Sequence, residues 1–80
     1  MNIQIIQGEF NAKDTLELLT KMIQIKIRYH ENKIMMNSSE EDIKARESKI
    51  KRLQNELFEL RENIQLKDRN YILDGNISIE

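Results

Sequence analysis

The chain has 80 residues, no cysteine and one histidine, which excludes disulfide bonds, thiolate metal sites and histidine-rich metal sites. Thirteen basic and fourteen acidic side chains give a net charge of −1, so no overall charge attracts nucleic acid or anionic lipid. A chain this short buries only about 60% of its unfolded surface, and without disulfides or metal we expect oligomerisation to supply stability.

No apolar run reaches the roughly 18 residues that a transmembrane helix needs. Met1 is followed by Asn2, Ile3 and Gln4, which do not form the basic segment and apolar core of a signal peptide. We therefore expect a soluble, cytoplasmic protein that does not bind membranes.

Residues 1–10 are interpreted as a short strand and the entry to a helix. The stretch 2–7, NIQIIQ, is rich in isoleucine and partly alternating, and Gly8 is expected to end it. Asn11 is a good N-cap, and Asp14 suits the positive end of the helix dipole. The pattern predicts a first helix over residues 11–36.

This first helix carries two apolar stripes on a helical wheel of about 100° per residue. They lie roughly 150° apart by the same geometry. The first stripe is Ala12, Leu16, Leu19, Ile23, Ile27 and Ile34, and the second stripe is Leu18, Met22, Ile25 and Tyr29. One other helix in the chain can cover only one stripe, so the remaining stripe predicts contact with another subunit.

A turn at residues 37–38 is expected to lead into a second helix over residues 39–70. Apolar side chains recur at heptad spacing along this stretch, as in a coiled-coil seam. The predicted core of the hairpin is Leu16, Leu19, Ile23, Ile27, Ile43, Ile50, Leu53, Leu57, Leu60 and Ile64. The predicted oligomer interface is Leu18, Met22, Ile25 and Tyr29, although the sequence does not decide which stripe faces the second helix.

Residues 71–80 form a C-terminal strand or a hairpin tail. Asp74 and Gly75 are typical of a tight turn, and Ile77 and Ile79 alternate with polar residues as in a half-buried strand. Both ends of the chain leave a helical hairpin at the same end, so the N-terminal strand and this tail are expected to pair, within one chain or between two.

Together these elements predict an all-α fold, in which a single domain of residues 1–80 forms an antiparallel, coiled-coil-like two-helix hairpin. Short β-strands stand at its N- and C-terminal ends, and the hairpins assemble into a helical bundle. Because a connection of two residues is too short to hold the helices apart in space, they must fold back on each other.

No arrangement of residues predicts catalysis, a cofactor or a metal. His30 is the only side chain suited to proton transfer near neutral pH, and the residue three before it is Ile27, so a Glu-x-x-His metal motif is absent. The acidic run Glu40, Glu41 and Asp42 matches charge at a helix N-terminus better than a calcium loop. We expect a protein that is not an enzyme.

The leading hypothesis is a homodimer or homotetramer that acts as an interaction or scaffolding module, with a further protein partner left open. The alternative is a small nucleic-acid-associated regulator. It would use the basic stretch Lys44, Arg46, Lys49, Lys51 and Arg52 of the second helix. Acidic residues interleave with this stretch, so a solvated helix face is favoured and nucleic acid is not the expected partner.

Overall fold

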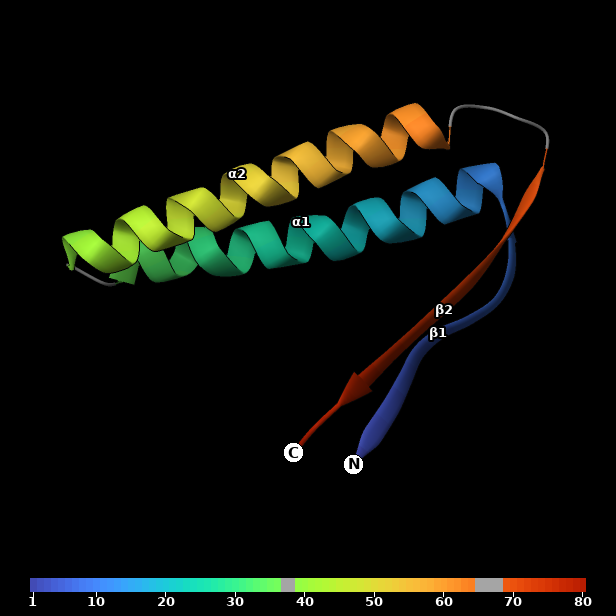
Figure 1. Ribbon diagram of the computed structural model, residues 1–80, viewed down its shortest axis with the longest axis horizontal. Helices are drawn as coiled ribbons and strands as arrows, with labels where there is room; N and C mark the ends of the chain where they lie inside the picture. The colour runs from blue at the N-terminus through green and yellow to red at the C-terminus, as the bar shows by residue number, and fades with distance from the viewer. Residues whose placement is uncertain (37–38, 65–68) are drawn as a thin grey trace.

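A computed structural model describes residues 1–36, 39–64 and 69–80. Their elements are, in chain order, β1 (Asn2–Asn11), α1 (Ala12–Met36), α2 (Glu40–Asn63) and β2 (Asn70–Ser78). The two helices form a hairpin, and the two strands pair antiparallel into a two-stranded sheet, here called the ribbon (Figure 1). The predicted pairing of the chain ends is confirmed, and it occurs within one chain.

The predicted all-α class is wrong, because 66% of the described residues are helical and 26% lie in strands, which is an α+β arrangement. β1, with 10 residues, is longer than the predicted strand, and β2, with 9 residues, begins at Asn70 and continues through the predicted turn. Their register joins Asn2 to Ser78 at one end and Asn11 to Asn70 at the other. The strands are long because each supplies the backbone partners of the other along this whole length.

The glycines do not end the strands as predicted. Gly8 lies inside β1 with a φ of 143°, a conformation that only glycine adopts readily. Asp74 and Gly75 lie inside β2 and form no turn; the register shifts beside them, between Gln4 and Ile6. A Cβ on Gly75 would lie 3.0 Å from Ile6 Cγ2, so the missing side chain makes room for the bulge.

The second helix is also shorter than predicted, since α2 ends at Asn63 and not near residue 70. Ile64 closes it by donating its backbone N–H to the carbonyl of Leu60 at 2.9 Å. Tyr71, which continues the heptad spacing in the sequence, belongs to β2. The predicted turn at 37–38 and the predicted helical residues 65–68 lie outside the described residues.

The junction between β1 and α1 is fixed by local hydrogen bonds. Asn11 Oδ1 accepts the backbone N–H of Asp14 at 2.7 Å, which confirms the predicted N-cap. Thr15, whose side chain is fully buried, directs its hydroxyl to the carbonyl of Phe10 at 3.4 Å. These contacts hold the last residues of β1 against the first turn of α1.

The molecule is flat and V-shaped, with extents of 46 × 33 × 13 Å. The helical hairpin is one arm and the ribbon is the other, and both chain ends lie at the free tip of the ribbon (Figure 1). Its radius of gyration is 15.2 Å, against about 11.6 Å for a compact chain of this length. The helices cover little of the ribbon, so most of the ribbon stands apart from them.

Candidate interaction surface

The first stripe of α1 faces α2. Leu16 and Ile64 line one depression between the helices, and His30 and Leu53 line another on the opposite side of the hairpin. All ten predicted core residues are buried or half-buried. Leu53 and Ile64 are the only apolar side chains below a tenth exposed in the described part of the chain. The hairpin core is therefore a thin single seam.

The second stripe of α1 lies on the side of the helix away from α2. Leu18 and Met22 are half-buried, whereas Ile25 is 65% exposed and Tyr29 is 54% exposed. The structure thus resolves which stripe meets the second helix of the same chain. The described residues leave Ile25 and Tyr29 exposed and cover Leu18 and Met22 only in part.

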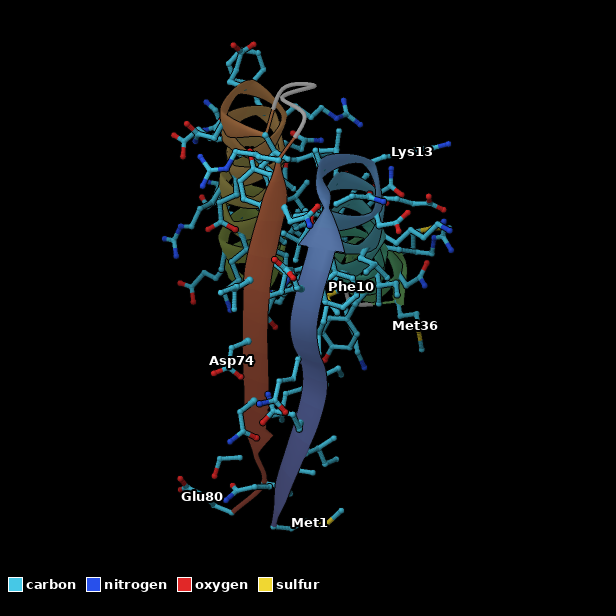
Figure 2. The ribbon with its side chains drawn as sticks, turned by 90° about the vertical axis from the view of Figure 1, so that its right-hand side faces the viewer. Met1, Phe10, Lys13, Met36, Asp74 and Glu80 are labelled. Atoms are coloured by element: carbon cyan, nitrogen blue, oxygen red, sulfur yellow. The ribbon has the colours of Figure 1, made fainter. Side chains whose placement is uncertain are left out.

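Phe10 extends this surface toward the ribbon. Its side chain lies beneath α1 (Figure 2) and shares a depression with Leu18, Asp14 and Glu17. The sequence assigned Phe10 no role beyond the strand and helix entry of residues 1–10. The signal that could have found it is the alternation of apolar residues, which continues through Gly8 to the end of β1.

Tyr29 lies at the other end of the second stripe, among cationic groups. The Lys33 ammonium is 5.7 Å from the centre of its ring, and the Arg46 guanidinium is 5.8 Å from it. Both distances are within the range of cation–π attraction. The His30 ring meets the Tyr29 ring edge-on, with centroids 5.3 Å apart.

His30 bridges the two helices through Arg46. The Arg46 guanidinium donates to His30 Nδ1 at 3.0 Å, which requires this nitrogen to be unprotonated. Desolvation lowers the pKa of His30, and the positive charges of Arg46, Lys49 and Lys26 lower it further. His30 is therefore neutral at physiological pH, and its Nδ1 can accept the hydrogen bond from Arg46 that joins the two helices.

Basic side chains from both helices gather beside His30. Lys26 of α1 and Lys49 and Arg52 of α2 line one shallow depression, together with Leu53 and Glu56. Lys44 and Lys51, which belong to the same basic stretch of the sequence, are exposed and do not line it. The basic stretch is therefore divided between this depression and other faces of α2.

Within residues 1–36, 39–64 and 69–80, no three His, Asp or Glu side chains are grouped closely enough to hold a metal ion. In this part of the chain, no helix is both long enough and apolar enough to cross a membrane. Comparisons with protein-family models, with curated proteins and with solved structures find no match to this chain.

Proposed function

We propose that this chain is a non-enzymatic, self-associating module that acts in protein–protein interaction or scaffolding, as a homodimer or homotetramer in the cytoplasm. The observation that carries the proposal is the second stripe, Leu18, Met22, Ile25 and Tyr29, of which Ile25 and Tyr29 are exposed and Leu18 and Met22 are only half-buried. Isolated exposed apolar residues are ordinary on protein surfaces, but a contiguous stripe on a helix marks a binding face.

The total surface supports self-association independently of the stripe. The chain exposes 6655 Å². A folded monomer of 9.6 kDa is expected to expose about 5,100 Å². The difference, about 1,500 Å² per chain, corresponds to about 3,000 Å² in a dimer, which lies in the range of obligate homodimer interfaces.

The proposal predicts the effect of placing lysine at both Met22 and Ile25. Burying a large aliphatic side chain contributes about 1.5–3 kcal/mol, and a buried lysine must also be desolvated. In a two-fold symmetric contact each change acts twice per dimer. We expect the double variant to have a smaller mass in light scattering and a lower melting temperature than the wild type.

The matched control places lysine at Gln24 and Asn55, two exposed positions outside both stripes. It adds the same charge and should leave mass and melting temperature nearly unchanged. A wild-type chain that is monomeric at tens of micromolar, yet melts cooperatively, would contradict the proposal.

Fractionation of cells that express a tagged chain tests the proposed location in the cytoplasm.

A second candidate function is nucleic-acid binding at the basic depression of Lys26, Lys49 and Arg52. The gathering of cations from two helices supports it, and Glu56 in the same depression weakens it. If it is right, the chain is retained on duplex DNA or RNA at low salt, and affinity falls steeply as salt rises.

Replacing both Lys49 and Arg52 with glutamine should then strongly weaken retention of the chain on nucleic acid. Glutamine at both Lys44 and Lys51 removes the same charge outside the depression and should weaken it less. Absence of retention at low salt would remove nucleic-acid binding as a function and leave the self-association proposal standing.

A further inference from the structure

The ribbon has one apolar face and one polar face. Residues opposite each other in an antiparallel pair point to the same side, so the register places Ile3 with Ile77 and Phe10 with Tyr71 on one face. A Cβ on Gly75 would contact both Ile5 and Ile6, which puts them on this face too. The other face carries polar pairs such as Gln7 with Asp74, and Ile72 is its exception.

The described residues leave the free half of the apolar face exposed. We call Met1, Ile3, Ile5, Ile77 and Ile79 the distal apolar face; their exposed fractions range from 38% to 81%. Near the helices Phe10, Tyr71 and Leu73 are half-buried, but the ribbon then diverges from α1 (Figure 1). A two-stranded sheet is marginal in water unless another layer packs on it.

Charge distinguishes the surfaces that could supply this layer. Residues 1–11 and 70–80 contain Glu9, Asp74 and Glu80 and no Lys or Arg, a side-chain charge of −3. α1 contains five Lys or Arg side chains against three Asp or Glu, a net charge of +2. Glu9 and Asp74 lie on the polar face, so these charges act at long range and not within an apolar contact. Two ribbons of charge −3 repel each other, whereas a ribbon is attracted to α1.

The second stripe of α1 is the matching apolar surface. By helical geometry it is flanked by Lys21 and Arg28 on one side and by Lys26 and Lys33 on the other. A helix packed on one face of a sheet is also a standard two-layer arrangement. The chain cannot bring its own distal ribbon to its own stripe in the V-shaped structure, so the occupant is a second copy.

We propose that two copies exchange their ribbons, with the distal apolar face of each ribbon lying on the second stripe of α1 in the other copy. This inference rests on the proposed self-association and names the surface that meets the stripe. One symmetric contact then covers both uncovered apolar surfaces. It is also consistent with the surplus of about 1,500 Å² per chain.

Single cysteines test the exchange cleanly, because the natural chain has none. The full-length variants Met22→Cys and Ile77→Cys are mixed, unfolded together, refolded and oxidised with glutathione disulfide. A disulfide requires the two Cβ atoms to lie about 4 Å apart, so it reports direct contact. Because each variant carries one thiol, every disulfide between protein thiols joins two chains, and a thiol capped by glutathione leaves its chain single.

We expect the mixed disulfide to form several-fold more than in the control mixture of Met22→Cys with Asn76→Cys, whose cysteine lies on the polar face. A disulfide dominated by Ile77→Cys with itself would show ribbon on ribbon and overturn the proposal. One dominated by Met22→Cys with itself would show stripe on stripe and overturn it equally. If Ile77→Cys fails to fold by circular dichroism, Ile79→Cys replaces it.

Light scattering of the wild type distinguishes a failure of the proposed self-association from a failure of the ribbon exchange alone. A monomer overturns the proposed function and the ribbon exchange together. A dimer whose mixed disulfide is no stronger than the control overturns the exchange alone and leaves self-association in place.

Discussion

His30 makes the stability of the hairpin depend on pH. Its ordinary pKa is about 6.5, and desolvation and the charges of Arg46, Lys49 and Lys26 lower it in the folded chain. Below about pH 6.5 the unfolded chain therefore binds a proton that the folded chain resists. The stabilising contribution is fully present above this pH and is lost as pH falls toward the lowered pKa.

We predict that His30→Gln reduces the loss of stability between about pH 7.5 and about pH 5.5. Glutamine can still accept from Arg46 but does not titrate. Urea unfolding of both proteins at the two pH values measures the effect. The lowered pKa of Glu17, caused first by its hydrogen bond from Lys21, acts at more acidic pH and does not interfere. Equal losses in both proteins would show that His30 is not responsible.

The backbone at Gly8 adopts a conformation that favours glycine. Its φ of 143° is strained for any residue with a side chain, whereas space is not limiting, since the nearest atom to an added Cβ is 3.5 Å away. We predict that Gly8→Ala lowers the free energy of unfolding by about 1–3 kcal/mol. Gln7→Ala, at the neighbouring exposed strand position, is the control. A similar change in both variants in urea unfolding would argue against backbone strain.

At the scale of elements, the ribbon is the part of the fold most dependent on long-range pairing. Its ladder continues past the strand ends, because Ile79 donates its N–H to the Met1 carbonyl at 2.7 Å. The Met1 ammonium in turn donates to the Ile79 carbonyl at 2.9 Å. The chain ends are thus held together by backbone bonds and by the Ile3–Ile77 pair.

We predict that deleting residues 76–80 lowers the melting temperature and exposes the amides of the first half of β1 to hydrogen exchange. The deletion removes the backbone partners of Asn2, Ile3 and Gln4. Exchange measured by mass spectrometry on N-terminal peptides reports it. Deleting Glu80 alone, which lies outside β2, should change neither property. Unchanged exchange in the longer deletion would mean that the distal ribbon does not stay paired in solution.

At the scale of the whole molecule, stability should depend on concentration. Among the described residues only Leu53, Ile64 and Thr15 are buried, too few to stabilise a flat, V-shaped chain of this size alone. If folding is coupled to association, the melting temperature rises with chain concentration. We predict a clear rise over a roughly hundredfold concentration range, measured by circular dichroism. A melting temperature independent of concentration would indicate a self-sufficient monomer.

Local chemistry in the sequence determined the helical hairpin, its first cap and the two stripes of α1. Helix periodicity and the Asn11 cap depend on residues within four positions of one another, which a single sequence displays directly. The same local signals failed at Gly8 and at Asp74 with Gly75. Dipeptides typical of turns can lie inside a strand when a distant partner strand satisfies their backbone.

The tertiary structure alone decided the α+β class, the stripe that faces α2 and the apolar face of the ribbon. Ile3 and Ile77 are 74 positions apart in the chain, and their pairing fixes which ribbon residues share a face. Both stripes of α1 look alike on a helical wheel, so only the position of α2 distinguishes them. Long-range pairing and packing are properties of the folded chain, which is why residue spacing could not supply them.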